Sequence, residues 1–488
     1  MNRKMIFNMV GRIMMIEAVL LLLPMFCSLI YKETCFYSFL ITAAVSLVFG
    51  ALLTVLTRTQ DKTIFAKEGF VIVALAWITL SAIGALPFVL SGSIPSYTDA
   101  FFEAVSGFTT TGASILTDVE IMPKGILFWR SFTHWVGGMG ILVLVMAIVP
   151  TDNGRSIHIM RAEMPGPIVG KLVPRIKSTA KILYLIYIFM TFVQVVLLFI
   201  GDMTLFDSLI HTFGTAGTGG FGIKNTSIAG YSPYIQWVIT IFMALFGINF
   251  NLYYLILIRK FRSAFKSEEL WWYVAIMLIS VGIITANIYP HTENFTEALR
   301  LSAFQVSSIM TTTGYSTTDF NMWPTLSKGI LLFLMFIGAC AGSTAGGLKV
   351  SRIILLFKQT VSNLKHMLHP RSVKTVRFEG KKTDNVILAD VSGYFVIYFI
   401  CFALIFLLLC IEPFDIETNI SAVAACFNNI GPGLGMVGPT GNYSVYSDFS
   451  TWLLSAAMLL GRLEIFPMIL LFSPTVWFKN RRSKGGAK

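Results

Sequence analysis

Residues 311–315 read Thr-Thr-Thr-Gly-Tyr, and residues 109–113 have nearly the same sequence, Thr-Thr-Thr-Gly-Ala. Two looser forms of the pattern occur as Ala-Gly-Thr-Gly-Gly at 216–220 and Asn-Asn-Ile-Gly-Pro at 428–432. We align the four stretches on their central glycines, which are Gly112, Gly219, Gly314 and Gly431. Because they recur at similar intervals, the alignment indicates one structural unit that occurs four times in the chain.

Each glycine stretch lies between two apolar segments that are long enough to cross a bilayer as helices. We expect first helices at 68–92, 179–201, 269–290 and 386–411, and second helices at 124–150, 232–260, 326–357 and 447–478. A carboxylate suits the positive end of a helix dipole, and an acidic residue precedes each glycine where a short helix would begin. These acidic residues are Asp99, Asp207, Glu297 and Glu417. The unit is therefore a helix, a short pore helix with its loop, and a second helix (M1-P-M2).

The composition of the whole chain agrees with a membrane protein. Of its 488 residues, 55% are hydrophobic and only 13% are charged, about half the charged fraction usual in soluble proteins. The net charge of +12 comes mostly from stretches that fall on one side of the membrane once the helices are threaded. These stretches are 3–12, 58–67, 155–181, 259–266, 349–382 and 479–488. This positive-inside pattern places both termini in the cytoplasm and argues against nucleic-acid binding.

We therefore predict an all-α polytopic membrane protein with pseudo-fourfold symmetry around one central path. An N-terminal two-helix hairpin (1–62), with spans near 8–30 and 37–57, precedes the four pore-loop repeats. Repeats 1 and 2 cover 63–155 and 156–266, and repeat 4 covers 383–488. Repeat 3 (267–382) includes a broken second helix and a cytosolic loop.

Non-helical backbone is costly in a bilayer unless it lines a water-filled cavity, so four such segments in one chain are expected to line the same cavity. Backbone carbonyls can replace the water shell of an alkali cation, and glycine tolerates the φ and ψ values that point successive carbonyls inward. The glycine stretches contain no acidic residues, which makes a divalent-selective site less suitable. The outer loops are mostly acidic, and we expect them to form a negative vestibule that concentrates cations.

Other kinds of chemistry have little support in the sequence. The six cysteines show no metal-ligand spacing, and we expect no structural metal and no covalent cofactor. Gly433–Gly438 matches the GxGxxG pattern of dinucleotide-binding loops, but it follows no predicted strand, so no dinucleotide site is indicated. A membrane enzyme would need clustered Asp, His or Glu, which the sequence does not indicate. We expect the protein not to be an enzyme.

The chain resembles the Trk/Ktr/HKT superfamily of potassium transporters over almost its whole length, and within it most closely the bacterial TrkH type. The motifs that carry the resemblance are Gly107–Ser114, His134–Gly140, Thr311–Tyr315, Ala341–Gly347, Asn428–Gly433 and Gly461–Glu464. The resemblance implies potassium uptake, with K+ as the bound and transported ion. It also implies a selectivity filter formed by Thr110, Thr111, Gly112, Gly217, Thr218, Gly219, Thr312, Thr313, Gly314, Asn429, Ile430 and Gly431. A serine in place of the first filter glycine goes with sodium permeation in some plant relatives, so Gly112 favours potassium.

The glycine-rich interruption of the 326–357 helix is a candidate gate. By resemblance, Gly342, Ser343, Thr344, Ala345, Gly346 and Gly347 form a movable intramembrane loop below the filter. The alternative is a close-packing interface between helices, which small residues also favour. Arg462 either projects into the path as a fixed positive charge, as the resemblance implies, or anchors carbonyls of this loop.

The resemblance also implies partners and a location. Relatives of this type form homodimers in the bacterial cytoplasmic (inner) membrane and bind a cytosolic, TrkA-like nucleotide-binding regulatory ring. The basic stretches 155–181 and 349–382 could dock such a partner or anionic lipid. An alternating-access symporter that couples K+ to H+ or Na+ is the main alternative to a channel-like path, but it predicts inverted repeats. We expect packing roles for Arg130 and His134, and the sequence suggests no role for Glu17.

Overall fold

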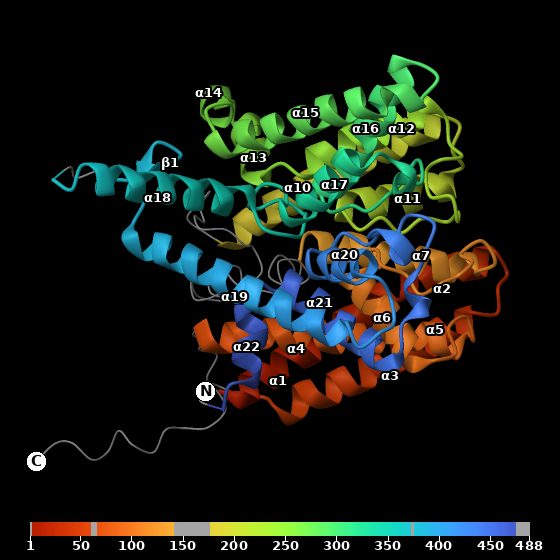
Figure 1. The fold of residues 1–488 in the computed structure, drawn as a ribbon. Coiled ribbons are helices and arrows are strands. Elements are labelled where there is room, and N and C mark those ends of the chain that lie inside the picture. Colours follow the sequence, from red (N-terminus) through yellow and green to blue (C-terminus); the bar gives the residue numbers. More distant parts are fainter. Residues whose placement is uncertain (1, 60–65, 141–175, 372–374, 475–488) are drawn as a thin grey trace, which may run out of the picture.

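The computed structural model describes residues 2–59, 66–140, 176–371 and 375–474 (Figure 1). In it, the first two apolar runs pack against each other as a hairpin. α1 (Arg3–Leu20) continues into α2 (Leu22–Ile30), and α3 (Phe36–Leu56) packs along α1. A Cβ atom on Gly11 or Gly50 would lie 2.7 or 2.6 Å from the carbonyl oxygen of the other glycine. The hairpin thus uses small residues to bring two backbones together, as membrane helices commonly do.

The four repeats follow in order around the centre of the molecule. Repeat 1 contains α4 (Ala66–Gly84), α5 (Leu86–Leu90), α6 (Tyr97–Phe108) and α7 (Lys124–Gly138). Repeat 2 contains α10 (Ile176–Ile200), α11 (Leu205–Gly217), α12 (Pro233–Phe246), α13 (Phe250–Leu257) and the short α14 (Phe261–Ala264). Repeat 3 contains α15 (Glu268–Ile288), η2 (Tyr289–His291), α16 (Phe295–Met310), η3 (Phe320–Met322), α17 (Thr325–Phe336) and α18 (Val350–Leu368). Repeat 4 contains α19 (Asn385–Leu409), α20 (Ile416–Phe427), η4 (Gly435–Val437), η5 (Tyr443–Val445), α21 (Asp448–Arg462) and α22 (Phe466–Phe472).

A small antiparallel hairpin of β1 (Arg377–Phe378) and β2 (Lys381–Lys382) ends repeat 3, just before α19. It lies beside α18, which extends away from the helical body on the same side as the N-terminal end of α1 (Figure 1). The predicted repeat boundaries near 62 and 155 fall outside the described residues. The boundary at 266 lies between α14 and α15, and the boundary at 382 lies at the end of β2.

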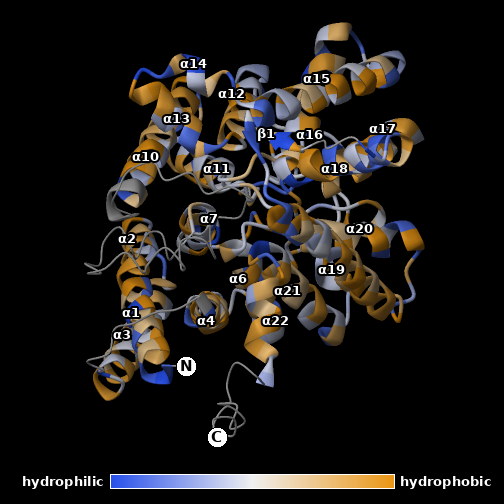
Figure 2. Cartoon of the chain, turned by 90° about the vertical axis from the view of Figure 1, so that its left-hand side faces the viewer, coloured by the Kyte–Doolittle hydropathy of each residue, from blue (hydrophilic) through white to orange (hydrophobic). Residues whose placement is uncertain are grey.

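Six helices in the described part of the chain are long and apolar enough to cross a membrane. They are Arg3–Ile30, Phe36–Leu56, Lys67–Leu90, Ala180–Ile200, Glu268–His291 and Asn385–Leu409. They correspond to the expected hairpin and to the first helix of each repeat. Hydrophobic residues cover much of these helices, as the orange colour in Figure 2 shows. The prediction of an all-helical, multi-span membrane protein is confirmed.

The second helices of the repeats are less regular than expected. α12 and α13 are bent by 90° at their break, and α21 and α22 are separated at 463–465, where Glu464 and Ile465 have positive φ. The expectation of continuous helices at 232–260 and 447–478 is therefore wrong. At the first break, Asn249 caps α13 by accepting from the Asn251 N–H, and the Gly247 carbonyl accepts from the Cys340 N–H. New partners thus satisfy the backbone groups that the bend exposes. The part of the expected 124–150 helix beyond residue 140 lies outside the described residues.

The four short helices begin where the acidic residues predicted them. The cap residues Ser96, Thr204, Asn294 and Asp415 each accept a hydrogen bond from a backbone N–H of the first turn. Asp99, Asp207, Glu297 and Glu417 lie in these first turns. The hydroxyl and N–H of Thr418 lower the pKa of the Asp415 carboxyl. The stabilisation from this cap is therefore present above the carboxyl's unfolded pKa and is lost as the pH falls through the lower folded value.

Candidate functional site

Each short helix ends in a loop with the same backbone pattern. One residue of each loop has a left-handed conformation with φ between 55° and 58°; these residues are Thr110, Thr218, Thr312 and Asn429. The next residue donates its N–H to the carbonyl five residues earlier at 2.8–2.9 Å. These donors are Thr111, Gly219, Thr313 and Ile430. The four loops are therefore equivalent residue by residue.

The glycine that follows each of these donors has a positive φ, between 76° and 97°. These glycines are Gly112, Gly220, Gly314 and Gly431. The second loop thus places Gly220, not Gly219, at the position equivalent to Gly112, which corrects our sequence alignment by one residue. The other predicted positions of this loop shift with it, so that Thr218 and Gly219 correspond to Thr110 and Thr111. Gly217 packs against α7, because a Cβ there would lie 2.2 Å from the His134 carbonyl oxygen.

The four loops close into a ring. A Cβ on Gly112 would lie 1.9 Å from the Gly219 carbonyl oxygen, and one on Gly220 would lie 2.0 Å from the Thr313 oxygen. The same contact joins Gly314 to the Ile430 oxygen at 2.0 Å and Gly431 to the Thr111 oxygen at 2.7 Å. Each glycine thus lies against the carbonyl of the next loop, and side chains are excluded from these contacts.

A cavity lies on each side of this ring. The outer cavity, of about 160 Å³, is lined by all four ring glycines. The inner cavity, of about 40 Å³, is lined by Gly342, Ser343, Ala345, Gly346, Gly347 and Arg462, among others. The ring of backbone carbonyls therefore separates an outer space from an inner space that borders the candidate gate.

The threonine hydroxyls of the loops hold neighbouring groups in place. Thr111 Oγ1 accepts from the Asn429 amide at 2.9 Å, which joins the first loop to the fourth. Thr312 Oγ1 accepts from the Gly346 N–H at 2.7 Å, and Thr110 Oγ1 accepts from Arg462 at 3.1 Å. The hydroxyls thus connect the ring to the elements beneath it.

The segment 337–349 between α17 and α18 folds back under the ring. Its two ends meet, because Gly338 N–H donates to the Leu348 carbonyl at 2.7 Å and Val350 N–H donates to the Ala339 carbonyl at 3.2 Å. Gly342 and Gly347 have positive φ. The buried Lys349 ammonium donates to the Ala345 carbonyl. This glycine-rich segment is therefore a loop rather than a helix–helix packing interface.

Arg462 connects three parts of the molecule at the inner end of the ring. Its guanidinium donates to the Thr344 carbonyl at 2.9 Å and to the Gly137 and Gly138 carbonyls at 2.7 and 3.0 Å. These bonds fit the anchoring alternative for Arg462. Because Arg462 also lines the inner cavity, its charge lies beside that space as well.

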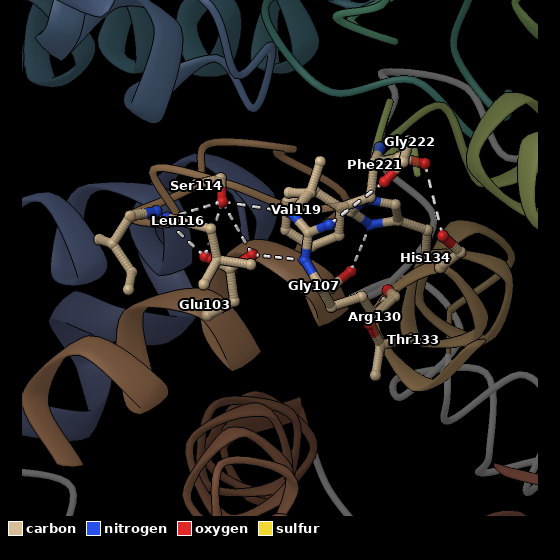
Figure 3. A network of polar contacts seen from close by, with 12 residues as sticks. Glu103, Gly107, Ser114, Leu116, Val119, Arg130, Thr133, His134, Phe221 and Gly222 are labelled. Carbon is tan, nitrogen blue, oxygen red and sulfur yellow. Dashed lines mark hydrogen bonds and ion pairs between the residues drawn. The ribbon is translucent and has the colours of Figure 1, made fainter. Parts of the chain in front are cut away.

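A buried ion pair between Arg130 and Glu103, which we did not predict, supports the outer side of the ring (Figure 3). Arg130 Nε lies 2.6 Å from Glu103 Oε1, and both side chains are almost fully buried. Arg130 also donates to the Gly222 carbonyl at 3.3 Å and to Ser114 Oγ at 3.1 Å. These contacts join the first loop to the second. We expected only packing for Arg130; because Glu103, Ser114 and Gly222 all lie on other segments, no local motif could reveal these partners.

His134 links the same two loops from α7 (Figure 3). Its Nδ1 lies 2.7 Å from the Gly107 carbonyl oxygen, and its Nε2 accepts from the Phe221 N–H at 3.3 Å. The His134 side chain is therefore a neutral imidazole with its proton on Nδ1. Tyr443 acts similarly on the fourth loop, where its hydroxyl donates to the Gly431 carbonyl at 2.7 Å.

The acidic side chains of the outer loops do not line the outer cavity itself. Its lining includes Arg130 and Lys224, and none of its described lining residues is Asp or Glu. Several outer acids instead bind loops: Asp118 accepts from the Asn225 amide at 2.8 Å, which lowers the pKa of that carboxyl. The lining of this cavity therefore contributes no carboxylate to the predicted negative vestibule, which stays a prediction about the outer loops.

Comparisons with known proteins agree on one family. A family model described as TrkH, cation transport protein, matches residues 37–478. The chain is 38% identical to the Trk system potassium uptake protein TrkH of Salmonella typhimurium, over 98% of this chain and 100% of that protein. It is 32% identical to the Trk system potassium uptake protein TrkG of Escherichia coli, over 97% of this chain and 98% of that protein. The crystal structure of the potassium transporter TrkH from Vibrio parahaemolyticus matches with a TM-score of 0.87 and 35% identity, covering 98% of this chain and 100% of that one.

Proposed function

Since the chain belongs to the TrkH family of cation transport proteins, we propose that it takes up K+ across the bacterial cytoplasmic membrane through the four-loop ring. The carbonyl oxygens of Thr111, Gly219, Thr313 and Ile430, with the residues around them, form its selectivity filter. The observation that carries this proposal is the closed contact between each ring glycine and the carbonyl of the next loop.

The chemistry of the ring suits a monovalent cation. Backbone carbonyls replace the water shell of K+ without adding fixed negative charge. The four short helices end at the ring, so their partially negative C-terminal ends face the place where a cation would lie. A membrane potential of about 100 mV supplies roughly 2.3 kcal/mol per elementary charge, which is enough to drive passive uptake.

Cation flux into liposomes that hold the purified protein tests the proposal. We expect K+ and Rb+ to enter and Na+ to be excluded. Equal entry of Na+ and K+ would contradict the filter. Liposomes with no flux would be tested again with the cytosolic partner, and absence of K+ flux in its presence would contradict the proposed function.

We further propose that loop 337–349 is the gate and that Arg462 holds it closed. Removing the guanidinium breaks the bond to the Thr344 carbonyl, and a hydrogen bond to a charged group contributes about 1.5–3 kcal/mol. Arg462→Gln is therefore expected to raise K+ flux about tenfold or more. Arg462→Lys separates the two roles, because lysine keeps the charge but lacks the planar fork that bonds the Thr344, Gly137 and Gly138 carbonyls from two sides. We expect Arg462→Lys to be open like Arg462→Gln, measured by the same flux assay; a closed lysine variant would assign control to the charge instead.

The cytosolic side carries the features of a docking surface. α18 projects from the body (Figure 1). Near its end, Leu364, Met367 and Leu368 are exposed beside the exposed Lys365. We propose that this part of the basic stretch 349–382 binds a TrkA-like nucleotide-binding ring, and that the protein acts as a homodimer with both termini in the cytoplasm. Residues 155–175 of the other basic stretch lie outside the described residues.

Charge reversal on α18 tests this docking. Lys365→Glu combined with Met367→Asp is expected to weaken binding of the cytosolic regulatory protein by at least about tenfold, since the double change removes a favourable charge and an apolar contact. K+ flux without the regulatory protein should stay at the native level, because both side chains are exposed in the last turn of α18, at the opposite end from loop 337–349. If surface plasmon resonance showed that this double variant binds the regulatory protein with native affinity, the docking surface would lie elsewhere.

A further inference from the structure

A basic segment, residues 259–266, joins α13 to α15 at the end of the molecule where β1 and the N-terminal end of α1 also lie (Figure 1). Half of its residues are Lys or Arg, and all of these basic side chains are exposed. They are Arg259, Lys260, Arg262 and Lys266. None of them forms an ion pair with the described residues. The basic segment therefore keeps its positive charge at the surface.

The two acids that follow the basic segment are already occupied. Glu268, at the start of α15, pairs with Lys358 of α18. Glu269 accepts from the Ala341 N–H at 2.7 Å and from the Ser351 N–H at 3.1 Å. Neither carboxylate bonds to the basic segment, so the charge of this segment is available to an external anion.

Large aromatic side chains are exposed among these charges. Phe261 and Phe265 of the basic segment are at least half exposed, and so is Trp271 at the start of α15. Trp271 Nε1–H donates to the Phe265 carbonyl at 2.8 Å, which joins the two elements at one corner of the molecule. Aromatic rings are enriched at the boundary between lipid chains and head groups, where one part of the ring is apolar and the other is wet. The corner thus combines positive charge with rings that suit a bilayer surface.

The position of the basic segment along the chain also places it at a bilayer surface. It directly precedes the long apolar helix Glu268–His291, which is able to span a membrane. It lies at the same end of the molecule as the N-terminal end of α1, which we assign to the cytoplasmic side (Figure 1). The cytoplasmic leaflet carries anionic lipids, which attract Lys and Arg residues next to a span.

Arg259 occupies a backbone position that usually belongs to glycine. α13 ends in a Schellman motif, because Lys260 N–H donates to the Leu255 carbonyl at 2.8 Å and Arg259 N–H donates to the Ile256 carbonyl at 2.9 Å. Arg259 has the left-handed conformation of this motif, with a φ of +60°. Glycine adopts this conformation without the steric cost of a side chain. The turn itself would favour glycine, so the arginine points to a role for its side chain outside the turn.

We propose that the basic segment and Trp271 bind the head group of an anionic phospholipid, such as phosphatidylglycerol, in the cytoplasmic leaflet. The four basic side chains attract the phosphate, and the exposed rings lie against the glycerol and the first carbons of the acyl chains. A lipid matches both the charge and the rings, whereas a free phosphate ion matches only the charge. The binding surface stands on its own contacts and does not require that the protein conduct K+.

The proposed lipid binds at one end of a helix whose other end contacts loop 337–349. Phe250 N–H, in the first turn of α13, donates to the Gly342 carbonyl at 3.1 Å. The basic segment begins directly after the last turn of this short helix. A lipid on the basic segment therefore holds α13 from its far end, and the backbone hydrogen bonds of the last turn should open less often.

Native mass spectrometry of the full-length protein in micelles with added lipid measures the binding. The protein is expected to bind phosphatidylglycerol more tightly than phosphatidylcholine. Each basic residue at an anionic lipid surface contributes roughly fivefold in affinity. Arg259→Gly should therefore weaken phosphatidylglycerol binding about fivefold while the turn keeps its conformation. Adding Lys260→Gln, Arg262→Gln and Lys266→Gln should bring the loss to at least about fiftyfold and remove the preference over phosphatidylcholine.

Lys381→Gln/Lys382→Gln is the matched control for Lys260→Gln/Arg262→Gln. It removes the same charge from an exposed strand at the same end of the molecule, where Phe378 of the hairpin is buried. The control should bind phosphatidylglycerol like the native protein. Equal losses in the two double variants would overturn the site, because the attraction would then be general.

Two further outcomes test the identity of the ligand. Inorganic phosphate in excess should not displace phosphatidylglycerol; complete displacement would show an ion site and overturn the lipid assignment. The variant without the four charges should lose lipid binding. If it kept native lipid binding but no longer bound the cytosolic regulatory protein, the surface would belong to a protein partner instead.

Hydrogen–deuterium exchange locates the bound lipid on the chain. In nanodiscs, phosphatidylglycerol in place of part of the phosphatidylcholine is expected to slow exchange in residues 255–266 of the native protein, but not in the variant without the four charges. Protection confined to other segments would overturn the site. Because neither measurement uses ion flux, a protein that binds the lipid here but never conducts K+ would contradict the proposed function and leave the lipid site standing.

Discussion

K+ flux through the Gly220→Ser protein is expected to fall at least about tenfold, and the remaining flux should no longer favour K+ over Na+. A Cβ on Gly220 would lie 2.0 Å from the Thr313 carbonyl oxygen, and the φ of +76° is unfavourable for any L side chain. The carbonyl must therefore move away, which disrupts the ring at two loops. Gly112→Ser should act in the same way, because its Cβ would lie 1.9 Å from the Gly219 oxygen. Flux of K+, Rb+ and Na+ into liposomes measures both effects.

Gly222→Ser is the matched control for this substitution. It lies two residues further along the same loop, and a Cβ there meets its nearest side-chain atom at 3.5 Å, an ordinary contact distance. We expect this variant to keep near-native flux and selectivity. If Gly220→Ser also kept native selectivity, the ring would not be the filter.

Glu103→Ala is expected to lower the free energy of unfolding by about 3–5 kcal/mol, because it leaves the Arg130 guanidinium buried without its counter-charge. Arg130 is 2% exposed, so water cannot compensate for the lost carboxylate. The same change should loosen the first and second loops, since Arg130 joins Ser114 to Gly222. Equilibrium unfolding in mixed micelles with increasing SDS measures the loss of stability.

Two comparisons separate the loss of charge pairing from general damage. The Glu103→Leu/Arg130→Met double variant removes both charges, and it should recover much of the stability. The exposed pair Lys328–Glu417 should contribute no more than about 1 kcal/mol, since water screens both charges. A loss from Glu103→Ala as small as that from Lys328→Ala would contradict a structural role for the buried pair.

The parts of the fold that local chemistry determines could be predicted from the sequence. Runs of apolar residues specify the six long spans, because a bilayer requires a minimum helix length. An acid in the first turn marked the start of each short helix, since a cap and a helix end are determined by neighbouring residues. The glycine stretches identified all four loops, because the conformation of each loop is also determined by neighbouring residues.

The register of the second loop could not be read in this way. Residues 216–220 contain three glycines, and the letters alone do not show which one has the left-handed conformation. The backbone hydrogen bonds decide, because Gly219 N–H bonds to the Gly214 carbonyl as Thr111 N–H bonds to Ser106. An alignment of the second loop that is shifted by one residue still matches a glycine with a glycine. In the molecule, the same shift would break the contacts that close the ring.

Interactions between distant segments account for the other differences. The bend at Gly247 depends on Cys340, and the Glu103–Arg130 pair depends on two helices meeting behind the loops. The outer acids were expected to form a negative vestibule, and the structure adds that several of them also cap helices or bind loops. Hydropathy reports none of these partners, because each is set by tertiary packing.

The closure of the ring between its first and last loops constrains how the protein is made. Asn429 donates to Thr111 across 318 residues, and Gly431 completes the circle of carbonyls beside Gly112. During synthesis, the first three repeats enter the membrane while this side of the ring is still open. The closed ring of carbonyls forms only when the fourth repeat is inserted. A ribosome that stalls before that repeat therefore releases a chain with an open ring, and under the function proposed above only completed molecules could conduct K+ selectively.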